Sequence, residues 1–279
     1  MILWLKKPKS IEVAKYIDCY WLLEKQADVK GNAYPKLNPD PSAHLILSPP
    51  EQPYNYKFYN EKLQGKGSHL LYPYCNTIQL DHSQPLKCLG IKFHVGALYA
   101  LNHAKTAKPL LDTIDEINIE KVLGITQASE NKLLTIAKDK PEDCCELLDE
   151  LLKPWLLKGI EDRHSELTNR VLSLLASLPI HKLSDELNCS QRTIERSFLR
   201  VAGMSLKQCQ SMNKLEEILE YLYLREKGDI DWVDIACQFG FSDQPHLIRY
   251  LKKQLHLTPK DYAQQRGFTI DIYGGVETK

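Results

Sequence analysis

The stretch DWVDIACQFGFSDQPHLIRYLKKQLHLTPKDY, residues 231–262, decides the fold of the C-terminal half of the chain. Its pattern predicts two helices joined by a tight turn. Asp231 can cap the first helix, and Gly240 supplies the positive φ that an abrupt helix end needs. We expect Ser242 to cap the second helix, with Pro245 at its third position, where a missing N–H does no harm.

The apolar residues of this stretch recur at helical spacing and separate a buried face from an outward face. The residues expected to face inward are Val233, Ile235, Ala236, Phe239, Phe241, Leu247, Tyr250, Leu251 and Leu255. Those left outward on the second helix are Gln244, Pro245, Ile248, Arg249, Lys252 and Lys253. Thr258, Pro259 and Asp261 are expected to open a third helix. A short-turn helix pair with Gln and Arg near the start of its second helix is typical of major-groove reading.

The same pattern occurs earlier, in PIHKLSDELNCSQRTIERSFLRVAGMSLKQ, residues 179–208. The two copies align without gaps at an offset of 53 residues, so that Arg196 corresponds to Arg249. Asn188 can adopt the left-handed conformation of the turn, and Ser190 can cap the second helix of this copy. Between the copies, leucines at helical spacing predict one long connecting helix over residues 206–225. A rigid connector would set two reading helices at a fixed separation.

The outward side chains of both copies suit contacts to DNA. Arg suits bidentate contact to guanine, Gln suits adenine, and Glu195 can accept from cytosine. The side chains expected to hold phosphates rather than to read bases are Arg200, Lys207, Lys252, Lys253 and Lys260. A solvated helix face is the alternative for any single one of these charges.

Length and composition are compatible with a DNA-binding domain of this kind but do not require one. The 279 residues can hold two domains, and 43% hydrophobic with 26% charged residues is ordinary globular composition. Lys and Arg together number 36, as do Asp and Glu, so the chain lacks the strong basic excess that usually marks a nucleic-acid binder. Basic residues therefore have to be concentrated locally, near the predicted reading helices.

Residues 1 to about 118 alternate short apolar runs with Pro, Gly and Asn clusters, which predicts a compact β barrel or sandwich after a helix at residues 11–17. The strand-like runs are CYWLLE, HLILS, YKFYN, NTIQL and CLGIKFH. Many aromatic residues could line a small-molecule pocket here or form ordinary core: Tyr20, Trp21, Tyr34, Tyr54, Tyr56, Phe58, Tyr59, Tyr72, Tyr74 and Phe93. Four histidines, His44, His69, His82 and His94, show no metal-binding spacing, so we predict no metal.

The pattern becomes helical after residue 96, with helices expected at 96–103, 127–138 and 141–157. The last carries a stripe made of Leu147, Leu148, Leu151, Leu152, Trp155 and Leu156. The stripe must be buried, either on the β domain or against a second subunit. The polar segment 158–167 is the expected linker between the halves. No segment has 18 consecutive apolar residues, and charges interrupt the N-terminal segment, so we expect a cytoplasmic protein without a membrane span. The eight cysteines are scattered and are expected to be reduced thiols.

The C-terminal residues resemble the AraC/XylS family of bacterial transcription regulators, whose DNA-binding domain holds two helix-turn-helix units joined by a long helix. The resemblance covers about residues 167–268. The second unit carries it through Ile235-Ala236, Gly240-Phe241, Ser242-Asp243-Gln244, His246, Arg249 and Thr258-Pro259. It implies that the base-reading positions are Gln191, Arg192, Glu195 and Arg196 in the first unit, and Gln244, Pro245, His246 and Arg249 in the second. Less specifically, the N-terminal half resembles the divergent cupin-like sensor domains of such regulators, through Tyr20-Trp21, Pro39-Asp40 to Leu47, and Gly90 to Gly96.

We therefore predict an α+β protein of two domains, with a β-barrel or cupin-like N-terminal domain flanked by helices and an all-α C-terminal domain. The expected divisions are a β-rich effector-binding domain over 1–118, a helical connector over 119–165, a double helix-turn-helix domain over 166–268 and a tail over 269–279. The predicted function is sequence-specific binding of double-stranded DNA in transcription regulation, under the control of a small-molecule effector or a subunit contact.

This interpretation also allows two further partners, RNA polymerase and a second copy of the chain. Neither a cofactor nor a catalytic residue is predicted. Two alternatives stay open on the sequence alone: an enzymatic or ligand-carrying β domain with an accessory helical module, and an assembly module built on the leucine stripe.

Overall fold

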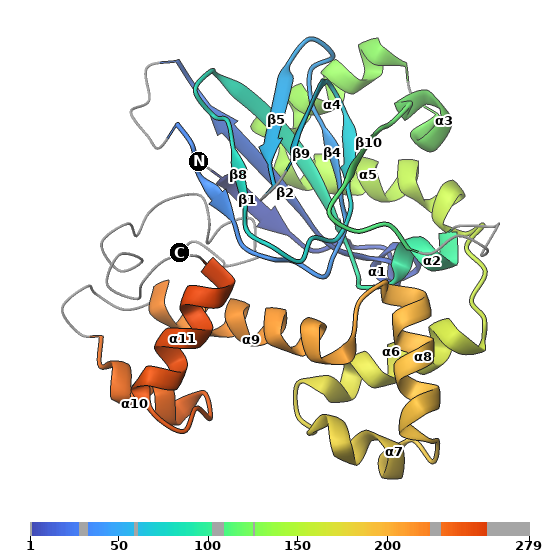
Figure 1. Ribbon diagram of the computed structural model, residues 1–279. Coiled ribbons are helices and arrows are strands. Elements are labelled where there is room, and N and C mark those ends of the chain that lie inside the picture. Colours follow the sequence, from blue (N-terminus) through green and yellow to red (C-terminus); the bar gives the residue numbers. More distant parts are fainter. Residues whose placement is uncertain are drawn as a thin grey trace.

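The computed structural model describes residues 2–27, 33–58, 61–101, 109–124, 126–223 and 230–255. Within them, every strand lies before residue 117, and the sheets stack above a layer of helices that comes from the C-terminal part (Figure 1). The predicted two-domain α+β architecture is confirmed. The exact domain divisions stay predictions.

The N-terminal domain is built from two antiparallel sheets. The larger has the strand order β1-β2-β9-β4-β7-β10, and the smaller has the order β3-β8-β5-β6. The larger sheet contains β1 (Ile2–Lys6), β2 (Ile17–Lys25), β4 (His44–Leu47), β7 (His69–Leu71), β9 (Leu86–Phe93) and β10 (Ile114–Glu116). The smaller contains β3 (Lys36–Leu37), β5 (Pro53–Lys57), β6 (Lys62–Lys66) and β8 (Ile78–Leu80).

Aromatic side chains fill the space between the two sheets. Trp21, Tyr56, Phe58 and Tyr74 are all less than 10% exposed and pack in one cluster with aliphatic residues of both sheets. Gly90 opposite Trp21 leaves room for the indole, because a Cβ there would lie 1.8 Å from Trp21 Cε2. A cavity of about 30 Å³ beside Trp21 and Tyr56 has room for water only. Trp21, Tyr56, Phe58 and Tyr74 are therefore core residues.

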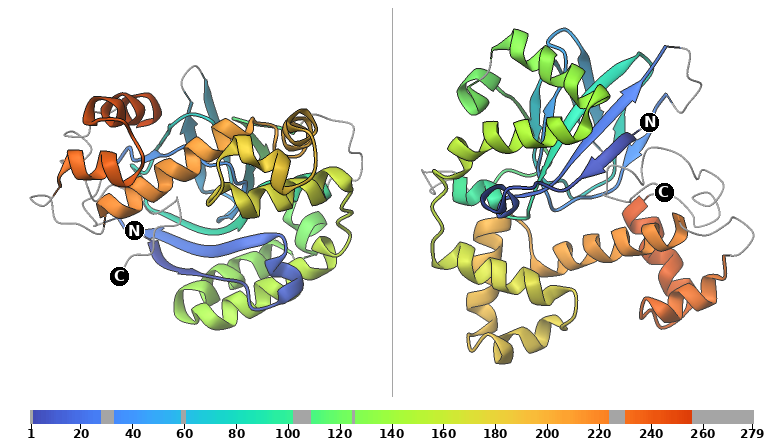
Figure 2. Two further views of the ribbon diagram at one scale, coloured as in Figure 1. Left: turned by 90° about the horizontal axis from the view of Figure 1, so that it is seen from below. Right: turned by 180° about the vertical axis from the view of Figure 1, so that it is seen from behind.

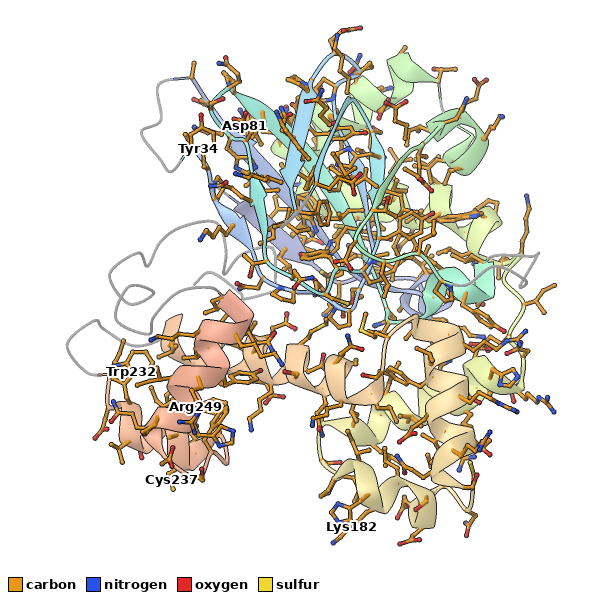
Figure 3. The ribbon with its side chains drawn as sticks, in the orientation of Figure 1. Tyr34, Asp81, Lys182, Trp232, Cys237 and Arg249 are labelled. Carbon is orange, nitrogen blue, oxygen red and sulfur yellow. The ribbon has the colours of Figure 1, made fainter. Side chains whose placement is uncertain are left out.

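Other aromatics of the predicted set lie elsewhere. Tyr34 is 53% exposed at the edge of the smaller sheet, near Asp81 (Figure 3). Tyr20 and Phe93 are buried on the opposite face of the larger sheet. Tyr59 lies outside the described residues.

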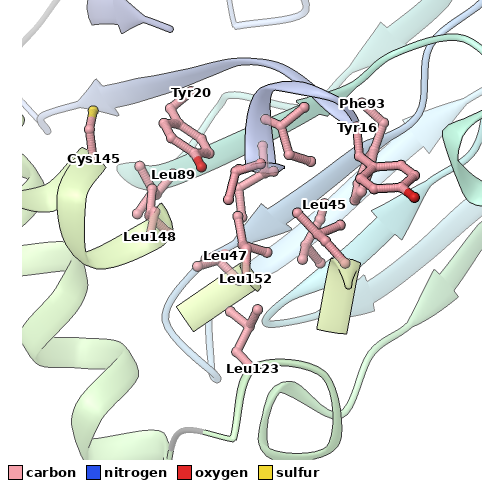
Figure 4. Close-up of a cluster of buried hydrophobic side chains, with 14 of the residues drawn as sticks. Tyr16, Tyr20, Leu45, Leu47, Leu89, Phe93, Leu123, Cys145, Leu148 and Leu152 are labelled. Carbon is pink, nitrogen blue, oxygen red and sulfur yellow. The ribbon is translucent and has the colours of Figure 1, made fainter. Parts of the chain in front are cut away.

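Helices α3 (Ile119–Leu123), α4 (Gln127–Asp139) and α5 (Pro141–Leu156) cover the outer face of the larger sheet. The stripe on α5 places Leu148 and Leu152, both 0% exposed, against Leu45, Leu47 and Leu89 of the sheet (Figure 4). The stripe is thus buried within the chain, which decides between the two positions that its periodicity left open.

Three details of the predicted secondary structure differ. The first helix, α1, is Ile11–Ala14, because Ile17 already pairs with Phe93 as part of β2. The helix after β9, α2, is Ala97–Leu101. Helix α6 (Arg163–Leu175) begins within the expected linker over 158–167, which stays a prediction as a domain division. The Asp162 carboxylate accepts hydrogen bonds from the N–H groups of His164 and Ser165 and starts the helix.

The C-terminal domain consists of two small helical units at opposite ends of one long helix. Its helices are α6, a 3₁₀ turn at Ile180–Lys182, α7 (Leu183–Glu186), α8 (Gln191–Ala202), α9 (Leu206–Tyr223), α10 (Trp232–Gln238) and α11 (Gln244–Leu255). Viewed from below, α9 runs beneath the sheets from one unit to the other (Figure 2). In the part of the chain that the structure describes, no helix combines the length and apolar character that crossing a membrane requires.

Candidate nucleic-acid interface

The second unit folds as its sequence predicts at the turn between its helices. The Asp231 carboxylate accepts hydrogen bonds from the N–H groups of Val233 and Asp234, and so caps α10. Gly240 ends the helix with φ of 66°, and the Phe241 N–H donates to the Ala236 carbonyl oxygen at 2.8 Å. Phe241 is 8% exposed and lies in the core of the unit, which fixes the angle between α10 and α11.

Three predictions about this unit are wrong by one position. The residue that caps α11 is Asp243, not Ser242, because its carboxylate accepts from the His246 N–H at 2.7 Å. Pro245 is therefore the second helical residue rather than the third, which it tolerates equally well. Val233 does not face inward but is 62% exposed, and Trp232 packs on the core in its place. The expected third helix from Thr258 lies outside the described residues.

The first unit repeats this construction with different residues. Asn188 takes the left-handed turn conformation with φ of 51°, and Ser190 Oγ accepts from the Thr193 N–H at 3.2 Å at the start of α8. Gly203, with φ of 75°, ends α8. Ile194 and Phe198 are 0% exposed, and α6 packs on α8 from the other side. Both reading helices are thus held from behind and present one free face.

Helix α9 sets the distance between the units. It has 18 residues, so it is about 27 Å long at 1.5 Å per residue. Successive major-groove faces on one side of DNA are about 34 Å apart. The connector therefore has the scale that two reading helices need to enter consecutive grooves.

The predicted reading residues of the first unit lie together on α8. Arg192, Glu195 and Arg196 are exposed, and Gln191 is half-buried. The Gln191 Nε2 donates to Glu195 Oε1 at 2.9 Å, which holds the two side chains on one side of the helix. Both line a surface groove together with Lys207 of α9, so a predicted base-reading pair and a predicted phosphate contact share one surface.

The predicted reading residues of the second unit lie on the first two turns of α11. Pro245, His246 and Arg249 are exposed, and Gln244 is half-buried. His246 is positioned by Ser242, whose Oγ lies 3.2 Å from His246 Nδ1, and by an edge-on contact with the Phe241 ring. Figure 3 places Arg249 on the part of α11 that is distant from the sheets. The structure thus presents both predicted sets on separate helices, one at each end of α9.

The predicted phosphate contacts fall into three situations. Lys207, Lys252 and Lys253 are exposed beside the reading helices. Lys260 lies outside the described residues. Arg200 is engaged within the protein, since its Nε donates to Tyr99 Oη at 2.9 Å and the Tyr99 hydroxyl donates to Asp162 Oδ2 at 2.8 Å.

Sequence reasoning missed a group of charges between the β domain and α9, in which Lys92 and Asp40 are buried and Glu216 is partly exposed. Lys92 of β9 places its Nζ 3.1 Å from Asp40 Oδ2 and 3.6 Å from Glu216 Oε1 on α9. Asp40 also contacts His44 Nε2 at 3.1 Å and accepts from the Ser42 N–H. Burial alone would raise the pKa of Asp40, but Lys92 and His44 hold it well below its usual value. A lysine in a strand of alternating apolar residues was the available signal, since an inward lysine needs a buried partner.

The pKa of Glu216 is shifted in the opposite direction from that of Asp40. Burial, opposed by Lys92 and helped by the negative charge of Asp40, raises its pKa to about 7. The domain-docked state therefore binds a proton more tightly than a separated state, in which Glu216 is solvated. By linkage, this group favours docking most below its ordinary pKa of 4.5, and the contribution is lost as pH rises through about 7.

This leads to a prediction for Glu216→Gln. The amide stays neutral at every pH, so we expect the variant to have the same free energy of unfolding as the wild type at low pH. At pH 8 the wild-type carboxylate is charged, and we expect the variant to be more stable. The gain should be only about 1 kcal/mol, because solvent screens a side chain that is 40% exposed. The measurement is urea unfolding at pH 4.5 and pH 8. The exposed neighbour Glu217→Gln is the control and should show no such difference; an equal pH response of the two variants would contradict the assignment.

Three of the four histidines of the N-terminal domain have different local partners. His69 Nε2 bonds to the Tyr56 hydroxyl at 2.8 Å, and burial lowers its pKa to about 4. His44 contacts Asp40, and His94 contacts the Ala14 carbonyl. Among the described residues, no three His, Cys, Asp or Glu side chains are arranged to hold a metal ion.

Comparison with known proteins finds one family match in each half of the chain. Residues 183–265 match the family model "Helix-turn-helix domain", and residues 8–113 match "Domain of unknown function (DUF6597)". No curated protein sequence matches the chain.

Three solved structures are similar in part. A variant of ToxT from Vibrio cholerae without ligand has 11% sequence identity and a TM-score of 0.49, over 88% of this chain and 97% of ToxT. ToxT bound to an unsaturated fatty acid gives 11% identity and a TM-score of 0.41, over 88% and 95% of the two chains. The AraC-like transcriptional activator CuxR gives 12% identity and a TM-score of 0.27, over 76% and 85%.

The duplicated capped units, the connector between them and the family match agree with one another. Residues 183–265 are an AraC-type helix-turn-helix domain, and the chain is a DNA-binding transcription regulator.

Proposed function

We propose that both units read double-stranded DNA together and that the N-terminal domain controls their access to it. The observation that carries this proposal is that the β domain contacts the C-terminal end of each reading helix. Tyr99 of α2 accepts from Arg200 on α8, and the Thr77 hydroxyl donates to the Gln254 carbonyl on α11 at 2.8 Å. The bond to Tyr99 holds the Arg200 side chain toward the β domain and restricts its reach toward a phosphate, so docking and DNA contact are proposed to compete for this side chain.

The control is exerted by a small molecule or by a subunit contact. The N-terminal domain is proposed to act as a sensor and not as an enzyme, because it is joined to a helix-turn-helix domain. The proposed setting is the cytoplasm, where DNA and RNA polymerase are both accessible. Contact with RNA polymerase and pairing with a second copy of the chain are further parts of this proposal.

The proposal is tested by DNA binding of the purified chain. We expect it to bind the region upstream of its own gene more tightly than random DNA at moderate salt, with affinity that falls as salt increases because lysines and arginines displace counterions. Equal affinity for the two DNAs would overturn sequence-specific reading.

Individual residues give a sharper prediction. Arg196→Ala and Arg249→Ala should each cost about 1–3 kcal/mol at particular base pairs, because each arginine is exposed on the free face of a reading helix. The measurement is a scan of all single-base changes in the bound site. The two arginines should affect positions about one helical turn apart, since they lie at opposite ends of α9.

Lys253→Ala is the matched control. Its side chain is exposed near the end of α11, beyond the first turns, so its loss should weaken binding to all sequences alike and reduce the salt dependence. Uniform losses for both arginine variants as well would assign the arginines to phosphates instead.

A further inference from the structure

The side chain of Gln191, the first residue of α8, is not placed to read a base by itself. A glutamine recognises adenine with both ends of its amide, because Nε2 donates to N7 while Oε1 accepts from the N6 amino group. In α8 the Nε2 of Gln191 donates instead to Glu195 Oε1 at 2.9 Å. The Oε1 of Gln191 is buried and has no hydrogen-bond partner among the described residues. The amide thus turns one end to Glu195 and the other end into the protein.

The chemistry of this pair fixes the orientation of the amide. A carboxylate only accepts hydrogen bonds, so the end of the amide that meets Glu195 has to be the donor Nε2. The reversed amide would place its oxygen against the carboxylate and lose the bond. Turning the amide toward DNA would also break the bond to Glu195. The pair therefore acts as one unit in which Gln191 supports Glu195.

Glu195 is the member of the pair that can reach a base. Its side chain is exposed, and the bond to Gln191 uses only Oε1, so Oε2 can still accept a hydrogen bond. In the major groove cytosine contributes only a donor, its N4 amino group, whereas adenine contributes the acceptor N7 beside its N6 amino group. A carboxylate therefore fits cytosine better than adenine.

Holding the carboxylate in place matters because glutamate is long and flexible. Loss of side-chain freedom opposes binding, and a side chain that is already held loses less of it. The DNA phosphates would also repel a loose carboxylate from the groove. Arg192 and Arg196 are exposed on the same helix, and Lys207 lines the same surface groove, so the carboxylate is surrounded by basic residues that offset this repulsion.

The second unit lacks this pair. At the offset of 53 residues, Gln191 corresponds to Gln244 and Glu195 corresponds to Ile248. Isoleucine cannot accept a hydrogen bond, so Gln244 has no carboxylate to hold at this spacing. An apolar side chain at a reading position suits the methyl group of thymine instead.

We propose that Gln191 is a positioning residue rather than a base reader, and that it fixes Glu195 to select cytosine in the half-site of α8, meaning the base pairs that the first unit contacts. The half-site of α11 has no such requirement at the corresponding position, where Ile248 favours thymine. The two half-sites are therefore unequal. This inference rests on the proposed function and refines it, since it states which base each unit selects.

The test measures base preference of the full chain by competition between DNA sites that carry every single-base change. Glu195→Gln identifies the base pair that Glu195 reads, and we expect the preference for cytosine there to fall about tenfold. Gln191→Met keeps the length of the side chain but cannot donate, so the preference at this same base pair should fall about fivefold. The methionine also removes a buried acceptor without a partner, so the variant should fold as well as the wild type.

Gln191→Lys provides a rescue. Lysine can donate to a carboxylate four residues later on a helix, but it has no acceptor and so cannot recognise adenine. The preference for cytosine at the base pair of Glu195 should therefore return to near the wild-type value. Loss of an adenine preference in Gln191→Met at a base pair where Glu195→Gln has no effect would make Gln191 a reader and overturn the proposal. Unchanged base preference in Gln191→Met would overturn it as well.

The matched control is Gln244→Met in the second unit. Ile248 needs no donor, so the base preference at the pair that responds to Ile248→Ala should stay as in the wild type. A loss there as large as the one caused by Gln191→Met would show that the effect does not depend on a carboxylate, and would refute the positioning role.

Failure of the proposed function gives a different result. A wild-type chain without base preference at any position refutes sequence-specific reading, and this inference with it. A wild-type chain that has base preferences, but in which Gln191→Met and Glu195→Gln do not act on one common base pair, refutes the inference alone.

Discussion

Lys92→Met is expected to lower the free energy of unfolding by about 3–5 kcal/mol, because it leaves the Asp40 carboxylate buried without its cation. Both side chains are nearly inaccessible, with 7% and 6% of their surfaces exposed, so water cannot replace the lost ion pair. Methionine has a similar volume, so the loss is electrostatic rather than one of packing. Urea unfolding of the full chain at pH 7 measures it.

Two further variants separate this cause from others. Lys62→Met removes a lysine that is exposed on β6 and should leave stability nearly unchanged. Lys92→Met combined with Asp40→Asn removes both charges and should recover most of the loss, since the expensive element is the unpaired charge. A Lys92→Met protein as stable as Lys62→Met would mean that Asp40 does not depend on Lys92.

Phe198→Ala is expected to cost about 3–5 kcal/mol, since it removes a fully buried aromatic ring from the core of the first unit. The ring packs between α6 and α7 behind the reading face, so its loss should also disorganise that face. We expect a regulator that still contacts DNA through α11 but has lost the half-site read by α8. Denaturant unfolding and footprinting of the bound DNA measure the two effects.

The adjacent residue provides the comparison. Leu199 is 49% exposed on the same helix, so Leu199→Ala should change stability by a small fraction of that amount. Leu251→Ala, at the corresponding buried position of the second unit, should reverse the pattern and remove the half-site read by α11. A Phe198→Ala footprint identical to that of Leu199→Ala would show that the first unit does not read DNA.

The helix-turn-helix units were predictable because their signals are local. Asp231, Asn188, Ser190 and Gly240 each act on backbone groups within four residues, so the sequence alone specifies the caps and turns. The errors occur where neighbours compete for one role. Ser242 and Asp243 can both cap α11, and the carboxylate takes the position.

A similar competition explains Val233. Helix α10 has only 7 residues, so its short apolar pattern fits more than one rotation, and Trp232 takes the inward position because it is larger. A helix of about two turns carries too few residues for periodicity alone to decide which face is buried.

The contacts between the domains could not be predicted, because they join residues far apart in the chain. Nothing near Lys92 in the sequence points to Glu216, and nothing near Tyr99 points to Arg200. The sequence also could not show which aromatic residues form the core and which line a cavity. Trp21 and Tyr56 are core residues, whereas Tyr72 and Trp155 line a cavity. Both pairs consist of one Trp and one Tyr, and they differ only in what the fold places opposite them.

The contact of Glu216 with Lys92 lies near the middle of α9, and the β domain also contacts Arg200 on α8 and Gln254 on α11. One domain thus holds both helical units and the helix that connects them. A change in the position of that domain would move both reading helices together, so two half-sites on DNA would be gained or lost as a pair.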